Sequence, residues 1–239
     1  MKLASDILAR ARTIIQDETN ARWSLLELCN WLNDGLLVTA THKPSAFART
    51  AQLSMSRGVL QVLPSMYSRL LSVTRNVRTG ASGRDPRRSI TIVSQALLDA
   101  HNPAWHDEYS VRYQSQVKHV IVDEANPRQF HVYPGNDGTG VIEAVVSAIP
   151  MAVAYTGAPD KLDSYRVSYG LDETYGPALL MYVLYAAYMK DAQHVGNANR
   201  AVACFQQYTN LLGIELAATA ATSPNAKAGI GQSAVGVAS

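Results

Sequence analysis

The stretch SLLELCNWLNDGL, residues 24–36, is the clearest guide to how this chain folds. It opens with a capping box, in which the Ser24 hydroxyl accepts a hydrogen bond from a free backbone N–H group and Glu27 reaches back to the backbone. Apolar side chains follow at helical spacing, and Trp23 precedes the cap, where it can contact the first turn. We predict an amphipathic helix that ends before Lys43-Pro44, because the residue before a proline disfavours helical geometry.

Similar patterns towards both ends of the chain predict further helices. Residues 3–17 carry apolar side chains at three- and four-residue spacing, with polar residues between them. Pro177 fits the first turn of a helix that reaches about residue 193, and residues 198–212 predict another helix that stops at Gly213. Because each apolar face needs a partner, we expect the helices from both ends to pack into one bundle.

The middle of the chain has the character of β-strands. Runs of β-branched, aromatic and other apolar residues, bounded by turn residues, lie at 59–64, 70–74, 90–93, 118–122, 129–133 and 141–147. The runs at 118–122 and 129–133 predict a β-hairpin with a longer loop. Short helices are expected at 45–53 and 95–100. A small antiparallel sheet is the simplest arrangement of these strands.

The expected fold class is therefore α+β, with a bundle of N- and C-terminal helices, a small antiparallel β-rich insertion and an extended C-terminal tail. The bundle is assigned to residues 1–55 and 170–216, and the insertion to residues 56–169. Residues 217–239 consist mainly of Ala, Gly, Ser and Thr, with a single charge at Lys227. Such a segment buries too little surface to order itself, so we expect a flexible tail that docks on a partner.

Composition excludes several classes of protein. The 239 residues are 47 % apolar, enough for a sizeable core, and 21 basic against 19 acidic residues leave a net charge of only +2. Any contact with nucleic acid must therefore be local. Cys29 and Cys204 lack the paired spacing of a zinc or redox site and are expected to be small buried residues. We expect no signal peptide and no membrane span, and hence a protein made in the cytoplasm.

Arginines concentrate in one segment. Between residues 69 and 88 a single acid, Asp85, accompanies six arginines: Arg69, Arg75, Arg78, Arg84, Arg87 and Arg88. With Gly80 and Gly83 at its centre, the segment predicts a flexible basic loop or hairpin. Arginine binds carboxylates and phosphates equally well, so the loop could face a partner protein or DNA, or be merely solvated. The partner protein is favoured, because gripping phosphates tightly would oppose sliding of DNA.

One cluster of ionisable residues could suggest an enzyme. His101, His106, Asp107 and Glu108 are close in sequence, but Pro103 prevents a helix from presenting both histidines on one face. We expect a structural role, with Trp105 as the packed residue. The sequence contains no phosphate-binding glycine loop, no Ser or Cys nucleophile in a recognisable elbow and no paired carboxylates in a turn context. We therefore predict no enzyme, catalytic residue, metal or cofactor.

Short motifs along the chain identify it more closely than the order of helices and strands alone. These are found at 14–17, 22–24, 27–28, 31–35, 43–44, 101–105, 127–130, 132–134, 175–179, 182–188, 190–192 and 196–198, with Phe205. On these residues the chain resembles the head-to-tail adaptor proteins of tailed bacteriophages, also called connector or head completion proteins. The resemblance covers most of residues 7–213 and leaves the tail outside.

The resemblance implies a structural protein of the virion, made in the host cytoplasm and placed in the neck or tail. It implies a ring, expected to be twelvefold to match the portal protein, between the portal and the tail or nozzle proteins. Genomic DNA would pass through the ring without sequence-specific binding, and no membrane is involved. The tail would run along the portal, which assigns portal binding to Pro224, Lys227, Ile230, Val235 and Val237. The alternatives are another helical tail or neck scaffold protein and, less favoured, a tail-associated cell-wall hydrolase.

Overall fold

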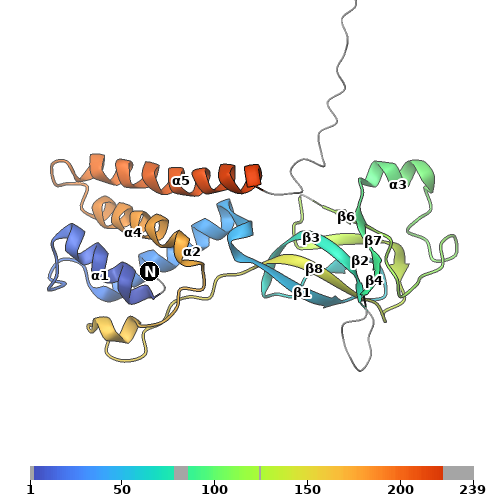
Figure 1. The fold of residues 1–239 in the computed structure, drawn as a ribbon, viewed down its shortest axis with the longest axis horizontal. Helices are drawn as coiled ribbons and strands as arrows, with labels where there is room; N and C mark the ends of the chain where they lie inside the picture. Colours follow the sequence, from blue (N-terminus) through green and yellow to red (C-terminus); the bar gives the residue numbers. More distant parts are fainter. Residues whose placement is uncertain (1–2, 78–85, 124, 223–239) are drawn as a thin grey trace, which may run out of the picture. The chain divides into compact units, whose positions relative to one another are not determined.

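The computed structural model of the chain describes residues 3–77, 86–123 and 125–222 (Figure 1). The chain divides into two compact units, each described by itself. We call Met1–Gly35 with Ala152–Ser239 the helical unit, and Leu36–Met151 the strand unit. Helix α2 begins in the first and ends in the second.

The helical unit is built around helix α4. Its elements are α1 (Ala4–Ile15), the first part of α2 (Leu25–His42), the short 3-10 helices η2 (Leu162–Tyr165) and η3 (Glu173–Tyr175), α4 (Gly176–Lys190) and α5 (Asn197–Thr222). Helix α4 is apolar nearly all round and packs against both α1 and α5, as Figure 1 shows. Its Leu179 and Val183 are fully buried, as are Ile7 and Leu8 of α1.

Aromatic side chains join α4 to α5. The rings of Tyr182 and Tyr208 lie 5.3 Å apart, and those of Tyr185 and Phe205 lie 5.0 Å apart. Tyr182 also lies against Gly35 of α2, where an added Cβ atom would come within 2.9 Å of the ring. A glycine is therefore needed for this close approach.

The connection between α1 and α2 is organised by one carboxylate. Asp17 is buried and accepts backbone hydrogen bonds from Ala21 at 2.8 Å, Arg22 at 2.9 Å and Trp23 at 2.8 Å. The Arg22 guanidinium in turn forms an ion pair with Asp191, which follows α4. The loop is thus held to the end of a helix that is remote in sequence.

The predicted start of α2 is confirmed. The Glu27 backbone N–H donates to the Ser24 hydroxyl at 3.2 Å, which is one half of the capping box. The helix ends at His42, before Lys43-Pro44, as the proline requires. The Glu27 side chain forms an ion pair with Lys190 of α4 at 2.5 Å.

The strand unit contains two four-stranded sheets. The first has the order β1 (Ala48–Ser54), β8 (Val141–Ala148), β3 (Tyr67–Val77) and β4 (Pro86–Ser89), with all neighbours antiparallel. The second has the order β2 (Gly58–Val62), β7 (Gln129–Asn136), β6 (His119–Val122) and β5 (Thr91–Ile92). In this sheet the neighbours β5 and β6 are parallel. The predicted hairpin of residues 118–122 and 129–133 is the antiparallel pair β6 and β7.

The main core of this unit lies between the two sheets (Figure 1). Val73 of β3 and Ile142 of β8 are buried in one cluster with Val120 of β6 and Phe130 of β7. The other face of the second sheet is covered by α3 (Gln95–His101) and the segment that follows, where Leu98 and Trp105 pack against Val59 and Ile121.

The expected architecture of a terminal helical bundle with a small antiparallel insertion and an extended tail is wrong. The described residues form five α-helices and eight strands in an α+β fold, and the strands build two sheets with one parallel pair. The helix expected at 45–53 is only the 3-10 turn η1 (Pro44–Phe47) followed by strand β1. Residues 217–222, assigned to the tail, extend α5.

Tertiary pairing explains the error at β1. The segment ARTAQLS has no strong strand propensity of its own. It pairs along its whole length with β8, from Ala48 opposite Ser147 to Ser54 opposite Val141, and Leu53 enters the core between the sheets. Cross-strand hydrogen bonds and burial of an apolar residue outweigh a weak local preference.

Candidate interaction surfaces

The predicted basic loop is the connection between β3 and β4. Arg75 lies in β3, and Arg87 and Arg88 lie in β4. Arg78 and Arg84 lie outside the described residues, and of Arg87 only the backbone is described. Of the six arginines between residues 69 and 88, the structure therefore describes the side chains of Arg69, Arg75 and Arg88.

Arg75 is paired within the molecule. Its guanidinium forms an ion pair with Glu143 of β8 at 2.9 Å, and the two residues stand opposite each other in the strand register. The Arg75 side chain is 40 % exposed and that of Glu143 is 19 % exposed. Much of the Arg75 charge is thus neutralised by its own sheet.

Arg88 lies in β4, the partner of β3. Ser89 is the register partner of Arg75, and the pairing shifts between Ser89 and Pro86, in the part of β4 that contains Arg88. Beside it, the buried Asn76 side chain donates to the carbonyl oxygens of Arg88 at 3.0 Å and Val117 at 2.8 Å, and accepts from the Val117 N–H. Asn76 thereby joins β4 to the residue that precedes Lys118 and β6.

This connection brings Arg88 near Lys118 and His119. The His119 ring makes a 2.6 Å hydrogen bond to the Thr91 hydroxyl and stacks on Tyr133, with 5.9 Å between ring centroids. Burial, followed by the charges of Arg88 and Lys118, lowers the pKa of His119 below its usual value of 6.5. We call Arg88, Lys118 and His119 the cationic corner. Sequence reasoning missed its last two members, because nothing local links them to an arginine thirty positions earlier.

Trp105, His106 and Asp107 of the predicted cluster have structural partners. Trp105 is buried, donates from its indole N–H to Asp99 at 2.8 Å and stacks on His106 with a centroid distance of 3.9 Å. The Asp107 carboxylate accepts from the Tyr109 N–H and the Ser110 hydroxyl, and these bonds lower its pKa. Within the described ranges no group of three or more His, Cys, Asp or Glu side chains is arranged to hold a metal ion.

One hollow of the strand unit is mainly apolar. This groove has a volume of about 280 Å³ and is lined by Leu37, Ala40, Thr41, Pro44, Ser68, Arg69, Pro127, Ile149 and Pro150. Leu37 is 52 % exposed and Ile149 is 44 % exposed, although both are large apolar residues. We call it the α2–β8 groove.

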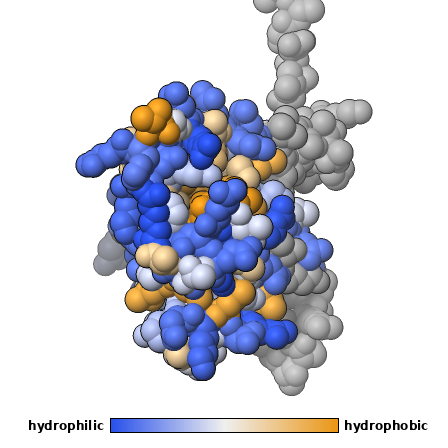
Figure 2. All heavy atoms as spheres, turned by 90° about the vertical axis from the view of Figure 1, so that its left-hand side faces the viewer, coloured by the Kyte–Doolittle hydropathy of each residue, from blue (hydrophilic) through white to orange (hydrophobic). Residues whose placement is uncertain are grey.

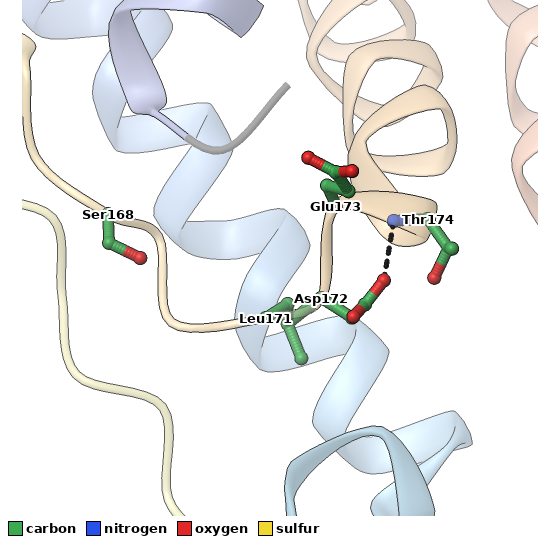
Figure 3. Close-up of a pocket in the computed structure, with 5 residues that line it drawn as sticks. All are labelled: Ser168, Leu171, Asp172, Glu173 and Thr174. Carbon is green, nitrogen blue, oxygen red and sulfur yellow. Dashed lines mark hydrogen bonds between the residues drawn. The ribbon is translucent and has the colours of Figure 1, made fainter.

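A second hollow, in the helical unit, is more polar. It measures about 290 Å³ and is lined by Ser168, Leu171, Asp172, Glu173 and Thr174 (Figure 3). The Asp172 carboxylate accepts a 2.9 Å hydrogen bond from the Thr174 N–H and so caps η3 ahead of α4. This arrangement is typical of a helix start and needs no ligand.

A comparison with protein families decides the identity of the chain. The family model described as SU10 adaptor protein matches residues 2–228, which is nearly the whole sequence. The chain belongs to the SU10 adaptor protein family. No curated protein matches it.

Membership confirms the resemblance to phage adaptors. As a member of this family, the chain is a structural phage protein and a component of the virion. The match passes through both units and ends within the predicted tail. The residues assigned to portal binding, Pro224, Lys227, Ile230, Val235 and Val237, lie outside the described residues.

The surface of this adaptor is mainly hydrophilic on the face shown in Figure 2, where hydrophobic residues form small separate patches. In the part of the chain that the structure describes, no helix has the length and apolar character needed to cross a membrane.

Proposed function

We propose that this adaptor forms a ring of identical subunits between the portal and the tail or nozzle, around the channel that carries genomic DNA. Twelve copies would match the symmetry of the portal. The observation that carries the proposal is the family match over residues 2–228. An adaptor of this kind acts by joining neighbours, so its surfaces and not a reaction centre are its functional parts.

The exposed apolar residues of the strand unit support a role in assembly. Leu37 and Ile149 border the α2–β8 groove, and the nearby Met66 and Met151 are 62 % and 88 % exposed. The Ile149 N–H donates to the Met66 carbonyl oxygen at 2.9 Å, which brings two of these side chains together. Exposed apolar residues gathered in this way are typical of surfaces that a partner covers.

The C-terminal segment supplies the second part of the proposal. Helix α5 ends at Thr222, and the residues beyond it carry three β-branched side chains, Ile230, Val235 and Val237, among small ones. An extended segment with a few apolar anchors can add to a sheet edge or fill a groove on the portal. Many weak contacts of this type, one from each copy, add up through multivalency.

Purified portal provides the test. The adaptor is mixed with portal, and the complexes are counted by mass photometry and imaged by cryo-electron microscopy. We expect a closed ring on the portal, and truncation after Thr222 should weaken the association. Portal bound with unchanged affinity by the truncated chain would remove the tail from the proposal.

Point variants separate the anchors from the length of the tail. Val235→Asp with Val237→Asp places charges where apolar anchors are proposed, whereas Ser233→Asp with Ser239→Asp places the same charges at neighbouring polar positions. Only the first pair should reduce binding. Mature virions that lack the protein would overturn the proposed function as a whole.

A further inference from the structure

We propose that the cationic corner of Arg88, Lys118 and His119 binds phosphate groups of the DNA backbone. The inference rests on the proposed function, in which DNA passes along the protein, and adds the residues that meet it. Arg88 comes from β4, Lys118 directly precedes β6, and His119 begins β6. The backbone segments that carry the three residues are brought together only in the folded chain, through Asn76.

The corner is held in place by buried contacts. Asn76, which is 2 % exposed, bonds to the backbone of both Arg88 and Val117, so it fixes the distance between β4 and the residue before Lys118. His119 is oriented by the Thr91 hydroxyl on one side and by the Tyr133 ring on the other. The backbone is thus rigid, while the Arg88 and Lys118 side chains are exposed to solvent.

Among the residues that the structure describes, no acid forms an ion pair with the corner. The charged groups that act on His119 are Arg88 from β4 and the adjacent Lys118, and both lower its pKa. Arg88 and Lys118 have no ion pair with another described residue, in contrast to Arg75, which is bound to Glu143. A phosphate placed here would meet two cations and a hydroxyl group.

The character of the corner favours DNA over an acidic protein. Interfaces between proteins have an apolar centre from which lysine and acidic residues, though not arginine, are depleted. The corner consists instead of three ionisable side chains beside a hydroxyl group. Exposed cations of this kind bind phosphates weakly and in a salt-dependent manner, mainly by releasing counterions. Weak contacts of this sort allow DNA to move past.

The test measures binding of a short fluorescein-labelled DNA duplex to the full chain by fluorescence anisotropy over a series of salt concentrations. The variant is Arg88→Gln with Lys118→Gln. The control, Lys161→Gln with Arg166→Gln, removes the same charge from the helical unit. The slope of log K against log salt is negative, and loss of two phosphate contacts should reduce its magnitude by about 1.8, since each contact contributes about 0.9. The control should leave the slope unchanged.

The His119 ring provides a second readout, one that a merely structural role would not move. Neighbouring cations lower its pKa, so bound phosphate should raise it, and NMR titration of the ring proton with and without the duplex measures the change. Equal slopes for variant and control, no binding at low salt, or stronger binding of poly-glutamate than of DNA would each overturn the inference. If portal association persists in any of these cases, the proposed function stands and only the corner is refuted.

Discussion

The carboxylate of Asp17 organises the loop between α1 and α2, and its replacement gives a sharp test of the helical unit. Oδ1 accepts from the Ala21 N–H, and Oδ2 accepts from the N–H groups of Arg22 and Trp23. The substitution Asp17→Asn keeps the shape but replaces one oxygen with an amide nitrogen that cannot accept. At least one donor then loses its partner, and the remaining hydrogen bonds lose their charge.

The expected loss follows from these bonds. A hydrogen bond to a charged group contributes about 1.5–3 kcal/mol, and a buried donor left without a partner costs about 1–3 kcal/mol. Since the Asn side chain can still accept from two of the three donors, we expect Asp17→Asn to lower the free energy of unfolding by about 2–3 kcal/mol. Hydrogen exchange at the amides of residues 21–23 should accelerate as well.

The effect must also depend on pH. Burial by itself would raise the pKa of Asp17, but the Trp23, Arg22 and Ala21 N–H groups and the Arg12 charge outweigh it, and the net pKa is below 3.8. A depressed folded pKa stabilises the protein fully above the unfolded value, and this stabilisation is lost as the pH falls through the folded value. The difference between wild type and variant should therefore be complete above about pH 5 and shrink on acidification below about pH 4.

Urea denaturation, followed by circular dichroism at several pH values, measures this difference. The control is Asp163→Asn, also in the helical unit, whose side chain is 92 % exposed and should matter by less than about 0.5 kcal/mol. A loss no larger than that of the control, or a loss that stays constant from neutral to acidic pH, would refute the reasoning.

Three further predictions concern single positions. Gly140→Ala would place a Cβ atom 2.4 Å from a backbone carbonyl oxygen, so we expect it to lower the free energy of unfolding, measured by urea denaturation, by about 1–3 kcal/mol. Gly213→Ala lies in open space on α5 and should raise the free energy of unfolding by about 0.5–1 kcal/mol. Cys29 is buried with its pKa raised to about 11, so Ellman's reagent should reach it at neutral pH only after unfolding. A double-mutant cycle on Arg75 and Glu143 should give a coupling of about 0.2–1 kcal/mol, because the pair is partly exposed. A coupling near zero would show that Arg75 is available to an external partner.

Local sequence signals predicted most helices and only part of the sheets, and the predicted end of the last helix at Gly213 is wrong, because α5 continues to Thr222. The start of α2 follows from Ser24 and Glu27, and its end from Pro44, because capping and proline geometry act over a few residues. The pair β6 and β7 was also predicted, since its strands are close in sequence. Strand β1 was taken for a helix because its partner, β8, is almost a hundred residues away.

The candidate interaction surfaces, too, could be predicted from the sequence only in part. The arginines between residues 69 and 88 are visible in the sequence, and so is the apolar character of the last residues. The sequence does not show which of these arginines can bind a partner. That depends on Glu143, which neutralises Arg75 within the first sheet, and on Asn76, which brings Arg88 close to the residue before Lys118.

The amino-acid sequence was enough to predict both ends of α2, the apolar segments and the resemblance to phage adaptors, since these properties depend on neighbouring residues or on matching motifs. Only the tertiary structure decided that the strands form two facing sheets and that Lys118 and His119 lie beside Arg88. Strand pairing and the meeting of charges depend on residues that are far apart along the chain, and their energies arise only when folding brings them into contact.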